Sequence, residues 1–422
     1  MMKRFISLTL GKLIYILCVF SFSVSAQQVE LESAVEQEGF DWSTLKKTWE
    51  DDIQFHGFFS QGLFHTTGNN VFGQSKNSVS AGLTELGLNI SYQALNNLSF
   101  VAQGLYRRAG ESTGDQGELS LDYAFVDITL LDFSSGRIGV RGGRVKNPWG
   151  VYNETRDVAF THPTIFLPLL YFERSRALLI SMDGGQVYAD YNTSVGNFIF
   201  KFNYGFMRDD NKELLLAITG GADVSGSIKS KPSLMTQLNY EIMGGQYAFA
   251  ITYSNINLGY TPGNDSDPFT GLQVCFESFI LSAQYNGERF SLVGEYNMQW
   301  NRFSGITNIR PDTSTVSEYW YVQAGYRLLD NLQMTLRYDS GVRDTNDRSG
   351  EKVHERTGAP AHFVFAQDIV VGLRWDITPS WMVRAEYQRV HGAAAVSLLD
   401  NPSIPDLALD WNVYALQVAF RF

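Results

Sequence analysis

The sequence predicts an all-β protein: a transmembrane barrel of sixteen antiparallel strands, with short periplasmic turns and long extracellular loops. Three observations predict this fold class. Charged residues make up 18% of the chain, against roughly 25% in soluble domains. After residue 26 no stretch reaches the ~18 uncharged apolar residues that a spanning helix needs. Apolar and polar residues alternate along many short segments, and a closed barrel of such strands satisfies every backbone group within lipid.

Residues 1–26 have the pattern of a secretory signal peptide. Three cations within the first twelve residues precede the apolar run 13–24, and small residues follow at Ser25 and Ala26. We expect cleavage after Ala26, which leaves 30 Lys and Arg against 44 Asp and Glu, a net charge of −14. This negative charge argues against nucleic acid as a partner. Cys275 is the only cysteine after residue 26, so the mature chain has no internal disulfide.

Residues 27–52 differ from the rest of the chain, because they are acidic and lack strand alternation. Leu45 and Trp49 stand four residues apart, a spacing that places both on one face of a helix. Two interpretations stay open for this periplasmic segment. It forms a short helix or a plug tucked into the barrel, or it is a disordered tail.

The strands of the barrel occupy residues 53–422. In the segment 332–339, for example, Leu336 and Tyr338 alternate with Arg337 and Asp339, which places apolar side chains toward lipid and charged ones toward the lumen. Sixteen strands are expected to begin near Ile53, Gly82, Leu98, Glu118, Arg137, Asp183, Phe198, Ser233, Gln246, Val274, Arg289, Glu318, Leu332, Phe365, Trp381 and Asp410. An additional pair around 177–182 and 214–228 would raise the number to eighteen.

The connections between these strands alternate in length. Tight turns are expected at sites such as 95–97, 243–245 and 329–331, where Asn, Gly and Asp are concentrated. Long polar segments lie between them, at 65–81, 107–117, 146–182, 208–231, 260–273, 302–317, 343–364 and 392–409. Short turns on one rim and long loops on the other are typical of outer-membrane barrels.

The last strand carries an assembly pattern. Its apolar face consists of Tyr414, Leu416, Val418, Phe420 and Phe422, alternating with a mixed face. An alternating aromatic strand that ends in Phe resembles the signal by which Gram-negative outer-membrane barrels are recognised for assembly. The resemblance implies a location in the bacterial outer membrane and contacts with its lipid, with lipopolysaccharide and with the barrel-assembly machinery.

Basic residues gather on the fifth expected strand and in the segment after it. They are Arg137, Arg141, Arg144, Lys146, Arg156, Arg174 and Arg176, and they face the local acids Glu154, Asp157 and Glu173. Arg137 and Arg141 are an even number of residues apart, so both belong to the lumen face, whereas Arg144 needs a bulge at 142–143 or a position at the strand end. We expect these cations to line a pore and attract anions. The alternative is that they bind lipopolysaccharide phosphates or pair with nearby acids.

The segment 147–176 is too long and too apolar for an ordinary surface loop. Pro163 and Pro168 interrupt its apolar run and exclude both a central strand and a long helix. An exposed loop of this composition would form an adhesive patch, so we expect it to pack against something. The favoured interpretation is folding into the lumen as a constriction, and contact with a neighbouring protomer is the alternative.

The run Arg137-Ile-Gly-Val-Arg-Gly-Gly-Arg144, with Val145-Lys-Asn-Pro-Trp-Gly150 and the long loop after it, resembles the fifth strand and third loop of Gram-negative porins, including the phosphate-selective group. The resemblance implies a passive diffusion channel for small hydrophilic solutes with an anion preference, Arg137, Arg141 and Arg144 near its narrowest point, and a homotrimer. The chain departs from the phosphate-selective group in having few inward lysines, with Lys201 isolated among the strands. Phosphate is therefore not predicted as the solute.

Further inward candidates carry both signs of charge. They are Arg337, Asp339, Asp368, Arg374, Arg384 and Glu386. Such a mixture predicts weak selectivity in an open pore, and it also suits a plugged barrel with internal salt bridges. A non-channel barrel with a structural or adhesive role is therefore the rival interpretation.

The sequence carries no recognisable catalytic motif, so an outer-membrane enzyme is the least favoured interpretation. The six histidines lack metal-ligand spacing, and we expect neither a metal nor another cofactor.

Overall fold

The computed structural model describes residues 53–110, 116–208, 212–219, 224–264, 267, 271–305 and 312–422. The expected signal peptide at 1–26 and the segment 27–52 lie outside these described residues. The statements below concern the described part of the chain.

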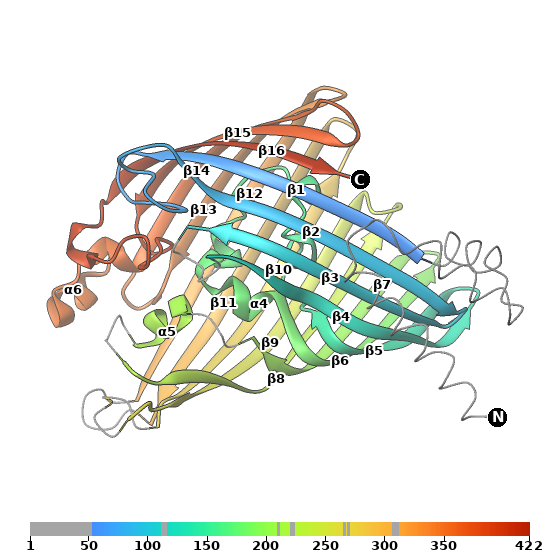
Figure 1. The fold of residues 1–422 in the computed structure, drawn as a ribbon, viewed down its shortest axis with the longest axis horizontal. Helices are drawn as coiled ribbons and strands as arrows, with labels where there is room; N and C mark the ends of the chain where they lie inside the picture. The colour runs from blue at the N-terminus through green and yellow to red at the C-terminus, as the bar shows by residue number, and fades with distance from the viewer. Residues whose placement is uncertain are drawn as a thin grey trace, which may run out of the picture. The chain divides into compact units, whose positions relative to one another are not determined.

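The strands form one closed barrel. They are β1 (Ile53–Thr66), β2 (Ser80–Leu95), β3 (Leu98–Ala109), β4 (Gln116–Phe133), β5 (Gly136–Lys146), β6 (Ser181–Thr193), β7 (Gly196–Met207), β8 (Ser227–Ile242), β9 (Tyr247–Thr261), β10 (Gln273–Asn286), β11 (Phe290–Ser304), β12 (Thr313–Leu329), β13 (Leu332–Val342), β14 (Phe365–Asp376), β15 (Trp381–Gly392) and β16 (Asp410–Arg421). Each strand pairs with its neighbours in chain order, and β1 pairs with β16 in an antiparallel register (Figure 1). The prediction of a sixteen-stranded antiparallel barrel is confirmed.

The expected strand starts agree closely with the observed ones, and the largest difference is at β8. This strand begins at Ser227 rather than near Ser233, and its pairing with β9 shifts between Lys231 and Leu234. Pro232 lies inside the shift, and since proline has no N–H to donate, a bulge is where a strand tolerates it. The eighteen-strand alternative is wrong, because the expected additional pair is helical in α4 (Arg176–Ile180) and α5 (Lys212–Thr219).

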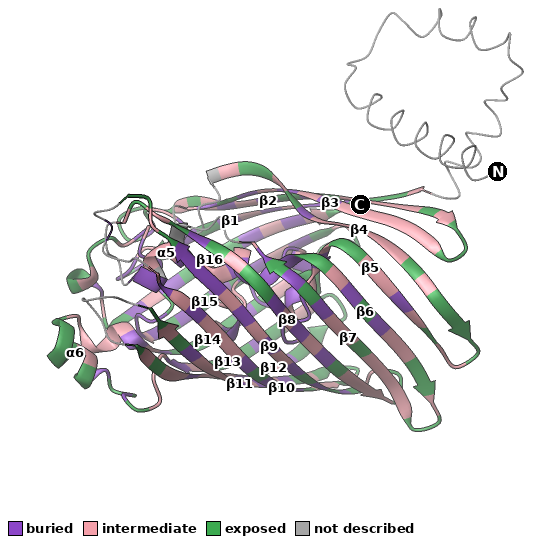
Figure 2. Cartoon of the chain, turned by 90° about the horizontal axis from the view of Figure 1, so that it is seen from below, coloured by how far each residue is buried: buried purple, intermediate pink, exposed green. Residues whose placement is uncertain are grey.

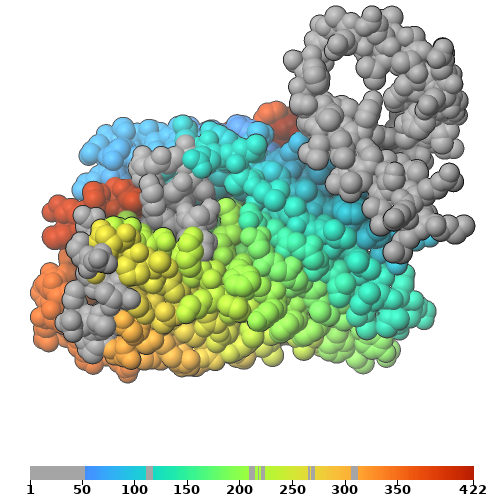
Figure 3. Space-filling view, turned by 60° about the horizontal axis from the view of Figure 1, so that its bottom comes forward, coloured from blue at the N-terminus to red at the C-terminus, as the bar shows by residue number. Residues whose placement is uncertain are grey.

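Side chains alternate between the two faces of the wall, as the burial pattern along each strand shows (Figure 2). In β13, Leu336 and Tyr338 are exposed on the outer face, whereas Arg337 and Asp339 are buried inside. The space-filling view shows the strands following one another around this wall in chain order (Figure 3). An apolar outer face and a polar inner face are what a barrel surrounded by lipid requires.

Short and long connections alternate around the barrel, so one end is the short-turn end and the other the long-loop end. Two residues join β12 to β13, whereas the next connection holds α6 (Glu351–Thr357) and the 3₁₀ helix η6 (Ala361–Val364). The connection from β15 to β16 holds η7 (Ile404–Asp406). Helices α5 and α6 lie at the long-loop end (Figure 1).

In the part of the chain that the structure describes, none of the helices is long and apolar enough to cross a membrane.

The longest connection between described strands runs from β5 to β6 and is called here the inward segment (147–180). It consists of short pieces, η2 (Asn153–Thr155), η3 (Ala159–Thr161), η4 (Leu169–Tyr171), η5 (Glu173–Ser175) and α4. Pro163 and Pro168 lie between these pieces, where their fixed φ and missing N–H interrupt regular structure. Phe172 joins η4 to η5 with a φ of 42°, a left-handed conformation that is uncommon for a side chain of this size.

A large apolar cluster packs the inward segment and α5 against the strands from β5 to β12. Its buried members are Val145, Trp149, Leu170, Tyr171, Leu178, Leu179, Met182, Met207, Leu214, Ile218, Ile228, Met235, Ile256, Leu258, Tyr260, Leu272, Val274, Ile280, Val293 and Tyr321. This side of the interior is therefore closely packed.

Candidate functional site

The inward segment crosses the interior of the barrel. It leaves from β5 and returns to β6, and the strands opposite to these in a ring of sixteen are β13 and β14. Its backbone accepts hydrogen bonds from Arg337 on β13, Arg374 on β14 and Arg384 on β15. Since those side chains lie across the ring from both ends of the segment, the segment spans the space between the two walls.

Arginines of the far wall bind the middle of the inward segment. The Arg384 guanidinium donates to the backbone oxygens of His162 at 2.8 Å and Thr164 at 2.6 Å. Arg337 donates to the Phe166 oxygen at 3.0 Å and forms an ion pair with Asp339. All of these wall side chains are buried, and carbonyl oxygens that are buried with them need such donors.

Carboxylates of the wall bind backbone N–H groups of the same segment. Ile165 donates to Glu386 at 2.5 Å and Leu169 donates to Asp339 at 3.3 Å. Val151 donates to Glu295 on β11 at 3.1 Å, and the Tyr171 hydroxyl donates to the same carboxylate at 2.5 Å. The wall thus fixes the segment by donors and acceptors at several points.

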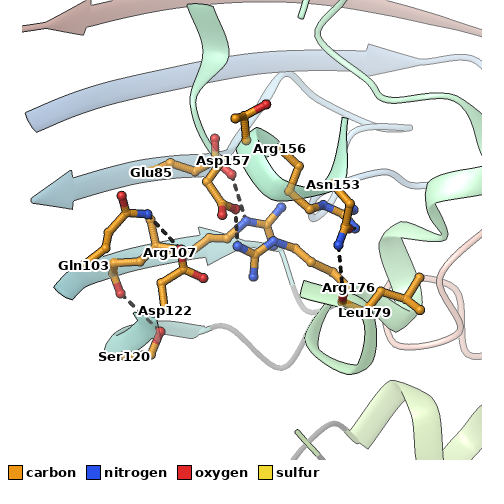
Figure 4. Close-up of polar contacts among 12 residues, drawn as sticks. Glu85, Gln103, Arg107, Ser120, Asp122, Asn153, Arg156, Asp157, Arg176 and Leu179 are labelled. Carbon is orange, nitrogen blue, oxygen red and sulfur yellow. Dashed lines mark hydrogen bonds and ion pairs between the residues drawn. The ribbon is translucent and has the colours of Figure 1, made fainter. Parts of the chain in front are cut away.

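Charged residues form a network where the inward segment meets β2 and β3. Arg107 contacts Glu85 at 2.9 Å and Glu173 at 2.5 Å, and Arg156 contacts Glu173 at 3.0 Å. In Figure 4, Arg156, Asp157 and Arg176 of the segment lie beside Glu85 and Arg107 of the strands.

Asp157 has two cationic partners, Arg176 and Lys146. Burial alone would raise the pKa of the Asp157 carboxyl, but Arg176 and Lys146 hold that pKa well below its usual range. Asp157 therefore stays ionised and keeps its cations in place at any physiological pH.

His162 is buried between the segment and the far wall. Burial, together with the positive charge of Arg384, lowers the pKa of His162 from 6.5 to about 3. One ring nitrogen lies 2.8 Å from the Thr164 backbone oxygen and the other 3.2 Å from the Arg156 oxygen. The imidazole is therefore neutral at pH 7.

Three cavities follow one another past the inward segment. The outer cavity, about 160 Å³, is lined by residues 70–72 and 393–397 of the long loops. The middle cavity, about 60 Å³, shares Phe72, Phe166 and Glu173 with the outer one. The inner cavity, about 290 Å³, shares His162 with the middle one and is bordered by residues 286–287 of a short turn. The middle cavity has room for only a few water molecules and is the smallest of the three.

The middle cavity is strongly charged. Its charged lining residues are Glu85, Arg107, Arg156, Asp157, Glu173, Arg176 and Arg384, called here the constriction cluster. Four arginines face three carboxylates, and His162 in the same lining is neutral.

The structure separates the arginines of β5 from this constriction cluster. Arg141 binds Asp127 at 2.8 Å and Gln186 at 2.8 Å on the inner wall, and its guanidinium lies 4.6 Å from the Tyr188 ring centre. Arg137 lies on the same inner face, 5.9 Å from that ring centre. Neither side chain lines the middle cavity, so the structure does not bring them together with the constriction cluster.

Arg144 does not line the interior, which corrects its predicted position. Arg144 lies three residues after Arg141, and the pairing of β5 with β4 and β6 shows no shift at 142–143. Arg144 therefore faces outward, where it pairs with the exposed Asp183 at 2.6 Å. The alternation of the strand simply continues through this site.

Of the other predicted site residues, Arg174, Arg337 and Asp368 line the outer cavity and Arg374 lines the inner one, whereas Lys146, Asp339 and Glu386 line none of the three. Lys146 pairs with Asp122 at 2.7 Å as well as with Asp157. Arg174 donates to the Val396 oxygen and lines the outer cavity together with Asp368. Arg374 pairs with Asp376 and lines the inner cavity.

Sequence reasoning missed the central role of Glu173. Alternation along β2 and β3 places Glu85 and Arg107 inside, but Arg107 meets Glu173 across 66 residues. No periodic signal indicates that contact, because Glu173 belongs to an irregular segment. Among the described residues no group of three His, Cys, Asp or Glu side chains is placed to hold a metal ion.

No protein-family model and no curated protein sequence matches the chain. Solved structures with a similar fold include OmpT, an outer membrane protein of Vibrio cholerae, in its trimer form, with a TM-score of 0.54 at 12% identity over 88% of this chain and 99% of that one.

Two further structures match at a TM-score of 0.53 and 14% identity, over 88% of this chain and 97% of each of theirs. They are the outer membrane channel DcaP of Acinetobacter baumannii and Salmonella typhi OmpF in complex with daunomycin. At such low identity the likeness concerns the fold. This chain shares the closed antiparallel barrel fold of these outer-membrane proteins.

Proposed function

We propose that the protein is an outer-membrane channel for the passive diffusion of small hydrophilic solutes. The observation that carries this proposal is the inward segment, which spans the barrel and leaves a charged space of about 60 Å³ between two larger cavities. A passage of this kind selects solutes by size and by charge. The long-loop end faces the medium and the short-turn end faces the periplasm.

The constriction cluster supports a weak anion preference. Its four arginines exceed its three carboxylates by one charge, and a low-dielectric wall amplifies the field of an unbalanced charge. We expect the preference to be weak, because Arg107, Arg156 and Arg176 are held in ion pairs.

The proposed assembly is a homotrimer in the outer membrane. The apolar outer face suits both lipid and a protomer contact, and the outward pair of Arg144 and Asp183 near the long-loop end suits lipopolysaccharide head groups. We propose that residues 1–26 direct export, and that residues 414–422 are read by the barrel-assembly machinery.

A closed barrel with a structural role is the second candidate, and the apolar cluster on the β5–β12 side favours it, since this cluster fills much of the interior. An enzymatic role is supported less. The sequence carries no recognisable catalytic motif that would favour it.

The test is single-channel conductance of the purified protein in a planar bilayer, with the reversal potential measured in a salt gradient. A channel gives stepwise currents with a modest anion preference. In Arg176→Gln the preference should shift toward cations, because Asp157 keeps Lys146 but the cluster loses its excess charge.

Arg144→Gln is the matched control, because it removes the same charge from the outer face. Silent bilayers from folded protein would contradict the channel and favour the structural role. Equal shifts of the reversal potential in Arg176→Gln and Arg144→Gln would contradict the assignment of selectivity to the constriction cluster.

A further inference from the structure

Asp368 is a buried carboxylate without a partner in the described part of the structure. It lies on β14, it is 6% exposed, and its Oδ1 atom has no hydrogen-bond partner. Directly across the strand pair lies Asp339, another carboxylate. Burying a charged group without a partner is costly, so a feature of this kind indicates a missing ligand.

The neighbouring cations do not compensate Asp368. Arg337 binds Asp339 at 2.6 Å and directs its other donors to Thr164 and Phe166 of the inward segment. Arg384 is bound to Gln417 and to the segment. Arg337 is therefore committed to Asp339, and Arg384 to Gln417 and the segment. The three buried carboxylates Asp339, Asp368 and Glu386 exceed these two arginines by one charge, and among the three only Asp368 has a buried oxygen without a hydrogen-bond partner in the described residues.

Asp368 lines the outer cavity, whose walls are apolar over most of their area and also carry the charged side chains Glu173, Arg174, Arg337 and Asp400, so that three carboxylates face two arginines. Phe172, Tyr319, Val390 and Trp411 contribute side chains to a space of about 160 Å³. Sites of this type take ligands whose apolar body fills the space, while one polar group fixes the orientation. A carboxylate ligand would meet repulsion from Asp368, whereas an ammonium would gain its partner there.

We propose that the outer cavity binds a primary ammonium group carried on a compact apolar body, with Asp368 as its anionic partner. The binding is independent of transport. In a channel, the bound amine would also obstruct the passage on the long-loop side of the constriction cluster. This consequence rests on the proposed function.

The test uses 2-phenylethylammonium as the probe, titrated calorimetrically into the folded protein in detergent. The neutral 2-phenylethanol and the anionic 3-phenylpropionate have the same ring without the cation. The ammonium should bind more tightly than both, and Asp368→Asn should weaken it by about ten-fold or more, as expected for the loss of a charged hydrogen bond. Asp406→Asn, which removes an exposed charge from the β15–β16 connection, should leave the affinity unchanged.

A second variant, Ala394→Phe, keeps Asp368 but fills the cavity from a loop position, and it should also abolish binding. Equal binding of the ammonium and the alcohol, or equal affinity in Asp368→Asn and the unmodified protein, would overturn the site. The same amine is then added to the long-loop side of a bilayer recording. Binding of the amine without any channel current would support the site and refute the proposed channel. Channel current without Asp368-dependent binding would support the channel and refute the site.

Discussion

Gly150 occupies a position that only glycine fits well. Its φ is 58°, and an added Cβ would lie 2.6 Å from the Tyr171 hydroxyl and 2.7 Å from a Glu295 carboxylate oxygen. These are the groups that bind the start of the inward segment to β11. Gly150→Ala should therefore displace that start, at a cost of about 1 to 3 kcal/mol in backbone strain alone.

The displacement is measured as a lower temperature of heat modification on electrophoresis and as noisier single-channel current. Gly142→Ala is the control, because a Cβ there meets nothing within 4 Å. Identical behaviour of both variants would contradict the role of Gly150.

His162 makes the stability of the barrel depend on pH. Because its pKa is lowered from 6.5 to about 3, the unfolded chain binds a proton between these values that the folded chain does not. The free energy of unfolding should therefore fall as the pH is lowered from 6.5 toward 3. The difference between the two pKa values of His162 corresponds to at most about 5 kcal/mol.

Heat-modification temperatures at several pH values check this prediction, with His162→Asn as the comparison. The variant should lose less stability than the unmodified protein below pH 6.5. An equal loss in both would show that His162 is not the group responsible.

Arg384 on β15 donates two of the hydrogen bonds that hold the middle of the inward segment. Arg384→Met removes the donors to the His162 and Thr164 oxygens, and orphaned buried acceptors cost about 2 kcal/mol. The segment should then loosen around residues 162–164 while its contacts with Arg337 and Glu386 remain, and the single-channel conductance should rise. Arg144→Met, on the outer face, should keep the original conductance, and a rise in both variants would argue against a local release.

The strands were predictable here, whereas the individual contacts of the segment between β5 and β6 were not. Alternation along a strand is enforced by lipid on one side and polar space on the other, so the inward faces of Arg337, Asp339 and Arg384 follow from sequence alone. The inward segment has no such period, and its position depends on contacts with residues more than 100 positions away, such as Leu169 with Asp339. The error at Arg144 arose from assuming that neighbouring arginines share one role.

At the scale of the whole molecule, the last strand both closes the barrel and carries the proposed assembly pattern. Phe422 exchanges backbone hydrogen bonds with Gly57 at 3.1 and 3.0 Å, and its ring covers the place of a Gly57 side chain. Phe422→Ser should reduce the yield of heat-modifiable barrel in outer membranes several-fold, whereas Leu409→Ser, just before β16, should not. Equal yields in both variants would contradict an assembly role for Phe422.

Pairing of β1 with β16 also determines when the molecule can fold. Ser60 meets Gln417 across 357 residues, so the ring is joined only after nearly the whole chain has been synthesised. Until that moment β1 and the newest strand are open edges that would pair with any other chain. Contacts so distant in sequence form slowly. Because the barrel closes only when β1 pairs with β16, the chain passes through a precursor with open strand edges that is prone to aggregate. Such a precursor needs protection until β16 is available for pairing.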